Sequence, residues 1–313
     1  MIVYTDSIRY SNRIITEKSN WEIEKKPYAF SESSLIKLLE TIFKHKTVYK
    51  TECDSYGIFK YILMTEYTGS SHYDLLIKLS KENAELPDGI ICLADSSHRF
   101  HGQRDRSWVA LPGNLHLSIY LAPNCQVKNI GASFLTLAAV SVIETVNSFQ
   151  DIKGRASIKW VNDILVDGAK LAGFLAHTRS TNDRVSSAIL GIGMNVQKTP
   201  VIHPDRFIQK AVSLSSLVSE SSECNQKIVL DRLLKRLKEN YHKIKKGQSR
   251  ELVALYREYS NIIGKKVTIL SDSENEESVE IASGTVVRIG ENLELYLDDN
   301  ESPITSGRLV FKS

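Results

Sequence analysis

The sequence has few of the residues that mark disulfide-bonded, fibrous or low-complexity proteins. Its 313 residues include only 4 cysteines (positions 53, 92, 125 and 224), and no two of them form a Cys-x-x-Cys pair. This scatter predicts reduced thiols in a cytoplasm-like compartment and no structural metal site. With 16 glycines and 7 prolines, the chain is also unlike collagen or a disordered Pro/Gly-rich protein.

A large charge excess and a membrane-length apolar run are missing too. The 40 Lys+Arg against 37 Asp+Glu leave a net charge of +3, which disfavours a protein that coats nucleic acid but leaves a local basic patch open. The most apolar long stretch, 132–143, is interrupted by Ser and Thr and falls short of the roughly 20 residues of a membrane span. The first acidic residue, Asp6, comes too early for a signal peptide. We expect a soluble, cytoplasmic protein without a membrane partner.

The composition and periodicity predict a folded chain of mixed secondary structure. Hydrophobic residues make up 42% and charged residues 25%, and this length suggests about two domains. Apolar periodicity predicts helices over 31–45, with a cap at 31–34, and over 132–148, 228–246 and 249–260. Alternating or short apolar runs predict strands over 58–67, 89–95, 115–121, 157–160 and 186–196, and a hairpin that turns at Asp167-Gly168. We therefore expect an α+β or mixed α/β catalytic core.

Two further regions differ from this core. After Gly264 the chain consists of short strands, turns and an acidic loop at 271–278, a pattern typical of a small SH3-type barrel, with a boundary near Asn261. Residues 1–60 contain one clear helix. The helix at 228–246 carries leucines on one face and Lys/Arg on the other, which favours a solvated face over a nucleic-acid patch.

A loop at 96–108, SSHRFHGQRDRSW, combines cations with a glycine between two expected strands. Several cationic donors beside exposed backbone suit recognition of a phosphate or carboxylate. A basic surface loop is an equally good interpretation of the same residues. The cationic side chains are His98, Arg99, His101, Arg104 and Arg106, grouped around Gly102.

Two other segments place polar groups or glycines at strand ends. Residues 158–163 (IKWVND) and 170–173 (KLAG) form a polar cluster on apolar strands, which is costly unless its members are paired or bind a ligand. The alternative is that Lys159 and Asp163 pair with each other. Residues 191–196 (GIGMNV) lack the third glycine of a dinucleotide-binding motif. Their glycines fit close strand packing as well as ligand contact.

In this order, these segments resemble the biotin–protein ligase (holocarboxylase synthetase) family, from about Tyr67 to the C-terminus. The family's arginine-rich loop precedes Trp108, and its serine-rich biotin segment resembles Ser70-Ser71-His72. Its K-W-P-N-D, K-x-x-G-[IV]-L and G-x-G-x-N motifs match residues 159–163, 170–175 and 191–195.

The resemblance implies an α+β, mixed-sheet ligase-like catalytic domain at 61–262 and an SH3-like C-terminal barrel at 263–313. Residues 1–60 are an extension of unknown role without a clear winged helix, so no DNA binding is expected. A homodimer through a sheet edge is possible in this family. The implied reaction is ATP-dependent: biotin becomes biotinyl-5′-AMP and is then transferred to a lysine of a carboxylase carrier domain, with Mg²⁺ accompanying ATP.

The resemblance also implies roles for individual residues. It implies no fixed metal site on the protein. The catalytic group is Lys170, Asp163 and Arg106. The biotin-binding group is Ser70, Ser71, His72, Ser97, His101, Gly102, Gln103, Lys170 and Gly173. The ATP-binding group is Arg104, Arg106, Trp108, Lys159, Asn162, Asp163 and Asn195.

The arginine loop departs from the family pattern. The family has G-[RK]-G-R with Trp five residues further on, where this chain has Phe100-His101-Gly102-Gln103. Gln103 replaces a charged phosphate contact worth about 2–3 kcal/mol, or tens- to hundred-fold in retention of the adenylate. A shifted register that brings Arg99 or Arg104 into this place is an alternative. Val161 replaces the proline of K-W-P-N-D, and Ser97 replaces a Gln.

Three functional readings remain at this point. The first, which we favour because the lysines, Asn162 and Asp163 are kept, is an active biotin–protein ligase, including one that is slow or releases its adenylate early. The second is a catalytically impaired paralogue that binds biotin or a carrier domain. The third is a ligase for lipoate or octanoate, since lipoate ligases share the fold.

Overall fold

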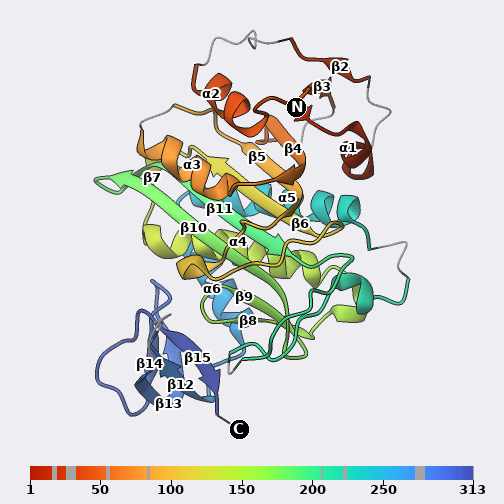
Figure 1. The fold of residues 1–313 in the computed structure, drawn as a ribbon. Helices are drawn as coiled ribbons and strands as arrows, with labels where there is room; N and C mark the ends of the chain where they lie inside the picture. Colours follow the sequence, from red (N-terminus) through yellow and green to blue (C-terminus); the bar gives the residue numbers. More distant parts are fainter. Residues whose placement is uncertain are drawn as a thin grey trace.

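The chain is built around one sheet of eleven strands (Figure 1). The computed structural model describes residues 1–15, 20–25, 33–53, 57–82, 85–205, 207–220, 224–271 and 279–312. The strand order is β2-β3-β1-β4-β5-β6-β11-β10-β9-β8, and β7 pairs with β11. The pairs β1–β4 and β4–β5 are parallel and the others antiparallel, so the sheet is mixed. The strands are β1 Ile2–Thr5, β2 Glu22–Ile23, β3 Tyr49–Glu52, β4 Tyr61–Thr68, β5 Ile90–Ser97, β6 Leu115–Leu121, β7 Cys125–Gln126, β8 Ala156–Lys159, β9 Asp163–Val166, β10 Ala169–Thr181 and β11 Arg184–Met194.

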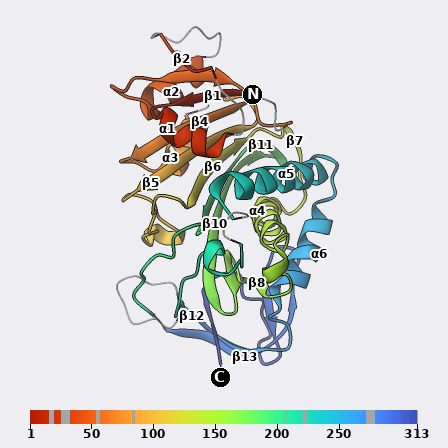
Figure 2. The same ribbon diagram turned by 90° about the vertical axis from the view of Figure 1, so that its right-hand side faces the viewer.

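Helices cover both faces of this sheet. Successive strand residues point to opposite faces, and along β5 Ile91 and Leu93 join one hydrophobic core whereas Ile90 and Cys92 join the other. The first core lies under α1, α4, α5 and α6, and the second under α2 and α3. Figure 2 shows α4, α5 and α6 together on one side of the sheet. The helices are α1 Ile8–Ile14, α2 Ser33–Ile42, α3 His72–Lys81, α4 Ile130–Val146, α5 Gln226–Lys245 and α6 Ser249–Ser260.

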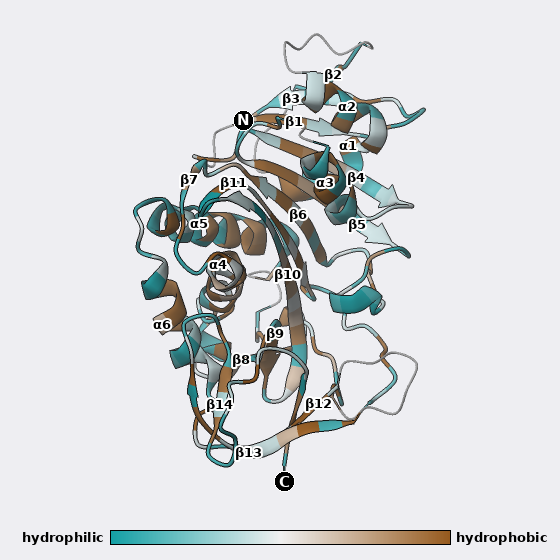
Figure 3. Cartoon of the chain, turned by 90° about the vertical axis from the view of Figure 1, so that its left-hand side faces the viewer, coloured by the Kyte–Doolittle hydropathy of each residue, from teal (hydrophilic) through white to brown (hydrophobic). Residues whose placement is uncertain are grey.

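The helix that the sequence predicts as buried is the centre of the larger core. Helix α4 has 13 buried residues out of 17, so it has no face left for solvent. Helix α5 covers it with its leucine face, and its basic residues lie outside, as on a solvated helix. Hydrophobic residues follow β6 and the inner sides of these helices in Figure 3. The sequence thus predicted an α+β core with a mixed sheet, and this is confirmed.

The hairpin at Asp167-Gly168 is confirmed in detail. Strands β9 and β10 pair around these two residues, whose φ angles are +49° and +79°. Positive φ at both central positions is the conformation of a type I′ turn, in which a short polar residue and a glycine are favoured. The helix predicted over 31–45 is shorter, at Ser33–Ile42, and its predicted cap at 31–32 lies outside the described residues.

Three features in the first 100 residues were not predicted, and the first is the helix α1, because only one helix was expected in residues 1–60. The described part of residues 1–60 does not stand apart, because β1, β2 and β3 extend the main sheet beyond β4. Residues 72–81, within a stretch interpreted as strands and turns, form α3, whose first turn is capped by the Ser71 hydroxyl accepting from Asp74 N.

The C-terminal residues form a second sheet at the opposite end of the molecule from β2 (Figure 1). Its order is β14-β13-β12-β15, and residues 272–278 of the acidic loop lie outside the described residues. Trp160 joins this sheet to the core, because its indole N–H donates to the Leu293 carbonyl at 2.6 Å. No described helix is long and apolar enough to cross a membrane. The strands are β12 Lys266–Leu270, β13 Glu280–Ile289, β14 Leu295–Leu297 and β15 Arg308–Phe311.

Candidate active site

A cleft of about 520 Å³ opens where β6, β10 and β11 present their side chains to the loop at 97–110. The 159–163 turn also lines it, and its outer wall is formed by residues 200–203, 205, 207, 208, 211 and 307–309. The three charged or glycine-containing segments of the sequence therefore meet in one place. Of the predicted residues, those that line the cleft are Ser71, His101, Gly102, Gln103, Arg106, Trp108, Lys159, Asn162, Asp163, Lys170, Gly173 and Asn195.

Lys170 is held at the centre of the cleft by backbone and side-chain contacts. Its N–H donates to the Lys210 carbonyl at 2.8 Å and its carbonyl accepts from Val212 N at 3.0 Å, while the β9–β10 register shifts between Lys170 and Ala172. Such an irregularity redirects a side chain out of the regular ladder. The ammonium pairs with Asp163 Oδ1 at 2.7 Å and lies 5.6 Å from the Trp108 ring centroid. A cation is thus fixed in a partly dry site.

Lys159 makes a different contact from the one considered in the sequence. Its ammonium donates to the Phe207 carbonyl at 2.5 Å, and the ion pair that Asp163 makes is with Lys170. Only 7% of Lys159 is exposed. Burial lowers the pKa of Lys159 to about 8, against the opposing effect of Asp163. Asn162 is anchored beside it, because its side-chain amide donates to the Phe174 carbonyl at 3.1 Å.

The loop at 97–110 is an irregular hairpin over the cleft. Trp108 N donates to the Phe100 carbonyl at 2.9 Å and Gly102 N donates to the Arg106 carbonyl at 2.6 Å. Its tip turns at Arg104 and Asp105, which both have positive φ, a conformation that side chains other than Gly, Asn and Asp rarely adopt. Arg106 Nε donates back to the Gln103 carbonyl at 3.0 Å.

His101 ties this loop to α3. Its Nε2 lies 2.8 Å from Asp74 Oδ2 and its Nδ1 lies 3.0 Å from the Gly102 carbonyl. Burial lowers the pKa of His101, but these two hydrogen bonds together raise it above its ordinary value. The loop therefore carries a histidine that is more cationic at neutral pH than a free imidazole.

The glycines of the 191–196 segment are covered by aromatic side chains of the cleft. A Cβ on Gly193 would come within 2.5 Å of the Trp108 indole, and a Cβ on Gly191 within 3.2 Å of the Tyr73 ring. A Cβ on Gly173 would lie 3.3 Å from Asp163 and 3.5 Å from Trp108. The glycines thus make room for two rings that line the cleft, rather than for a neighbouring strand.

Three polar atoms that line the cleft are buried and have no hydrogen-bond partner among the described residues. They are Trp108 Nε1, His116 Nε2 and Asn195 Oδ1. Burial lowers the pKa of His116 to about 4, and its Nδ1 lies 3.2 Å from the Ala94 carbonyl, so the ring is neutral and its Nε2 is an acceptor. Buried polar groups are normally satisfied, so one donor and two acceptors here are suited to a polar ligand.

Several predicted residues lie away from the cleft surface. His72 is buried at the start of α3 against the Phe100 ring, and Ser97 Oγ accepts from Arg99 N. Ser70 lies just before α3 and does not line the cleft. Arg104 lines a neighbouring shallow hollow instead.

Sequence reasoning missed the outer wall of the cleft. Arg308, on β15, stacks on the Phe207 ring with its guanidinium carbon 3.2 Å from the centroid, and it lies 3.4 Å from Asp205. No local pattern marks these residues, because they meet only through the packing of the C-terminal sheet. Tyr73 could have been found, since Ser71-x-x-Asp74 is a helix-capping pattern that orients the first turn of α3.

Known proteins provide a comparison for this geometry. Residues 69–195 match the model of the biotin/lipoate A/B protein ligase family. The chain is 34% identical over 166 residues to the bifunctional ligase/repressor BirA of Bacillus subtilis, with 50% of each chain covered. It is 29% identical over 208 residues to a biotin–[acetyl-CoA-carboxylase] ligase of Mycobacterium tuberculosis, covering 64% of this chain and 71% of the relative. The chain thus matches about half the length of its Bacillus relative.

The fold is also that of a solved protein. The structure of the Aquifex aeolicus biotin protein ligase in complex with biotin and ATP superposes with a TM-score of 0.62 and 23% identity. This match covers 81% of the present chain and 99% of the Aquifex chain. At this identity the likeness concerns the arrangement of helices and strands.

Proposed function

We propose that the chain, whose residues 69–195 match the model of the biotin/lipoate A/B protein ligase family, is an ATP-dependent biotin–protein ligase. The observation that carries this proposal is the Lys170–Asp163 pair, 2.7 Å apart and beside Trp108, in the same cleft as a neutral ring acceptor on His116 that has no partner among the described residues. One cleft thus combines a fixed cation for phosphate and carboxylate with polar groups suited to a ureido ring.

The first step joins two anions. The biotin carboxylate oxygen attacks the α-phosphorus of ATP, the bond to the bridging oxygen breaks, and pyrophosphate leaves with that electron pair. Charges of equal sign are brought together, so a preorganised cation lowers the barrier more than it lowers the energy of the bound substrates. Lys170 is in a position to supply this cation, and Asp163 holds its ammonium in place.

The second step makes an amide. The ε-amine of a carrier lysine attacks the anhydride carbonyl, AMP leaves, and the attacking nitrogen releases a proton. Asp163 and Asn162, at the cleft end of β9, are placed to orient this amine. We assign the triphosphate to Arg106 and Lys159 and the adenine to Trp108, with Asn195 as a further polar contact.

The acid-binding end of the cleft is apolar with a few polar atoms. Phe100, Phe174 and Trp108 give it the apolar walls that a bicyclic ligand requires. The His116 Nε2 acceptor suits a ureido N–H, and Ser71 borders the same end. Gln103 and His101 lie in the loop above, where they would bind the mixed anhydride with less charge than two arginines.

Further parts of the proposal follow from the family. Mg²⁺ is proposed to enter with the triphosphate, whose charge it would partly neutralise. The acceptor is proposed to be a biotin carboxyl carrier domain in the cytoplasm, and a homodimer through the sheet edge is compatible with this reading. We propose a catalytic domain at 61–262, whose sheet the described part of residues 1–60 extends without operator binding, and a C-terminal domain at 263–313 as an SH3-like barrel.

The test is transfer of labelled biotin to a biotin carboxyl carrier domain with Mg-ATP, with Lys170→Ala beside the native protein. Lys210→Ala is a matched control, because it removes an exposed lysine whose backbone alone supports Lys170. The proposal expects labelling by the native protein and by Lys210→Ala, and none by Lys170→Ala.

Competition between biotin, lipoate and octanoate decides the acid in the same assay. Preference for lipoate or octanoate would replace the biotin assignment with the related ligase reaction. Folded native protein that adenylates none of the three acids would overturn the proposal and leave a binding paralogue.

A further inference from the structure

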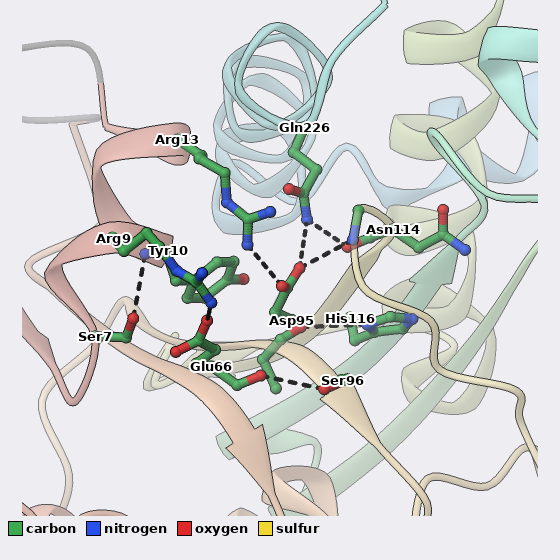
Figure 4. Close-up of polar contacts among 12 residues, drawn as sticks. Ser7, Arg9, Tyr10, Arg13, Glu66, Asp95, Ser96, Asn114, His116 and Gln226 are labelled. Carbon is green, nitrogen blue, oxygen red and sulfur yellow. Dashed lines mark hydrogen bonds and ion pairs between the residues drawn. The ribbon is translucent and has the colours of Figure 1, made fainter.

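A buried carboxylate, Asp95, lies behind the cleft near the end of β5. Its side chain is 4% exposed, and its Oδ2 receives a hydrogen bond from Arg13 at 2.7 Å. Its Oδ1 accepts from Gly113 N at 3.0 Å and from the Gln226 side chain at 3.2 Å. Figure 4 shows the side chains of Arg13 and Gln226 both pointing to the Asp95 carboxylate. A charge removed from water in this way is tolerated only with such partners.

The same group of residues continues into Asn114, which has no exposed surface. Its Oδ1 accepts from the backbone N–H groups of residues 196, 197 and 198 at 3.0, 3.1 and 2.9 Å. Gln226 links the two halves, because its side chain also donates to the Asn114 carbonyl at 2.8 Å. The start of β6 is therefore fastened to the chain that directly follows β11.

These contacts help to position His116 and Asn195, two residues that line the cleft. His116 lies two residues after Asn114, and its ring is hydrogen-bonded to the carbonyl of Ala94, the residue before Asp95. Asn195 immediately precedes the three amides that Asn114 holds. A shift of Gly113 and Asn114 would thus move His116 and Asn195 together, and displacements of this kind of about 1 Å can cost 10²-fold in rate.

The cation comes from a segment outside the 69–195 family match. Arg13 lies in α1, and its guanidinium carbon is 5.4 Å from the Tyr10 ring. Its side chain is 47% exposed, so it covers the buried Asp95 from the solvent side. Among the described residues, Arg13 is the only charged group within ion-pair distance of Asp95.

Building on the proposed ligase function, we propose that Arg13 is a positioning residue for the acid-binding end of the active site. It neutralises Asp95, which holds Gly113, and through Asn114 this fixes His116 and Asn195. Helix α1 is then part of the catalytic unit. Its Arg13 sets the geometry of the cleft through Asp95, without lining the cleft itself.

The variants are Arg13→Gln, Arg13→Lys and the double variant Arg13→Gln/Asp95→Asn. Arg9→Gln is the matched control, because Arg9 lies on the same helix and pairs with Glu66 at 2.5 Å, but with 84% of its side chain exposed. The first readout is hydrogen exchange at the amides of Gly113 and residues 196–198. The second is KM for biotin against kcat for adenylate formation, measured well below the melting temperature of each variant.

We expect Arg13→Gln to raise exchange at these amides at least tenfold and to raise the KM for biotin about tenfold with a smaller change in kcat. Arg13→Lys is expected to keep amide exchange and the KM for biotin within about threefold of the native values. The double variant is expected to return both quantities most of the way to the native values, because neither charge is then left unpaired. Arg9→Gln changes neither.

Unchanged exchange and unchanged KM in folded Arg13→Gln would overturn the inference, as would equal effects of Arg9→Gln and Arg13→Gln. If Arg13→Gln does not fold, Arg13→Lys and the double variant test the inference instead. The inference then requires that both variants show near-native amide exchange and a near-native KM for biotin. Hydrogen exchange is measured without substrate. If the protein adenylates no acid, the proposed function is refuted, but the exchange measurement still shows whether Arg13 positions these amides.

Discussion

The two sides of the cleft are built differently. The β8–β10 side holds Lys170 and Asp163 on strands, with a backbone fixed by two hydrogen bonds to residues 210–212 and a turn secured by Trp160 and Tyr256. The loop side, 97–110, is an irregular hairpin with Arg104 and Asp105 exposed at its tip. It departs from the family pattern at Phe100, His101 and Gln103, whereas the strand side departs at Val161, whose preceding peptide bond is cis, and at Phe174.

This difference separates two tasks. Bond making requires a cation held within a fraction of an ångström, which strands provide. Retention of the adenylate requires a cover that opens for substrates and products, which a loop provides. Replacements in the loop are therefore expected to change how long the intermediate stays, and replacements on the strands to change whether it forms.

Apart from the loss of Lys170 itself, the largest effect is expected where the two sides touch. Gly193→Val places a side chain where the Trp108 indole lies 2.5 Å from a Cβ position, so the ring and the loop must move away from Lys170. We expect kcat/KM for adenylate formation to fall about 100-fold, in line with misplaced catalytic groups. Gly131→Ala is the control, since a Cβ there meets no atom within 4 Å. Native kinetics in Gly193→Val would show that the ring does not take part.

The next effect is a gain on the loop side. Gln103→Arg adds a charge-assisted phosphate contact worth about 2–3 kcal/mol, so the half-life of bound biotinyl-AMP is expected to rise tens- to hundred-fold while its formation rate changes little. Dissociation of labelled adenylate after removal of ATP measures this. Arg104→Gln in the same assay tests the shifted register: a loss of retention there, without a gain in Gln103→Arg, would assign the contact to Arg104.

A pH effect is expected on the strand side. Burial lowers the pKa of Lys159 to about 8, so this lysine is mainly cationic at pH 7 and becomes neutral as the pH rises through 8. If it binds the triphosphate, KM for ATP rises up to about tenfold per pH unit above that value. Lys159→Arg, which stays charged, is expected to flatten the profile between pH 8 and 9.5. Identical profiles would remove Lys159 from the nucleotide site.

The smallest effect concerns His101. Its pKa is raised by Asp74 and by the Gly102 carbonyl against the lowering effect of burial, so retention of the adenylate declines as the pH rises through this pKa. In Asp74→Asn the pKa is lower, and the decline moves to lower pH, with about a two- to threefold loss of retention at pH 7. The Asp105 carboxylate lies 3.5 Å from His101 Nδ1 and is 89% exposed, so Asp105→Asn is expected to shift the pKa of His101 less than Asp74→Asn does. NMR titration of the imidazole checks the order.

Much of the core could be predicted because its signals are local. The Asp167-Gly168 turn, the apolar helix α4 and the leucine face of α5 are each specified by neighbouring residues. Strands β1 to β3 could not be, because short strands at a sheet edge are recognised only through pairing with distant residues such as those of β4.

The site divides in the same way. Lys159, Asp163 and Lys170 are marked by unusual polarity on apolar strands, and the structure brings them into one cleft. Arg308 and Phe207 carry no such mark, since their place depends on the docking of the C-terminal sheet. The helix at His72 was missed because Ser70-Ser71-His72 was interpreted as a ligand contact, although Ser71-x-x-Asp74 is also a capping pattern.

One measurement tests the division between the two sides most directly: single-turnover formation and subsequent release of biotinyl-AMP in Lys170→Ala, beside Lys210→Ala and Gln103→Arg. We predict that Lys170→Ala slows formation about 10³-fold, as for loss of a preorganised charge, that Gln103→Arg slows release alone, and that Lys210→Ala matches the native protein. Formation at the native rate in Lys170→Ala, with only faster release, would contradict the account.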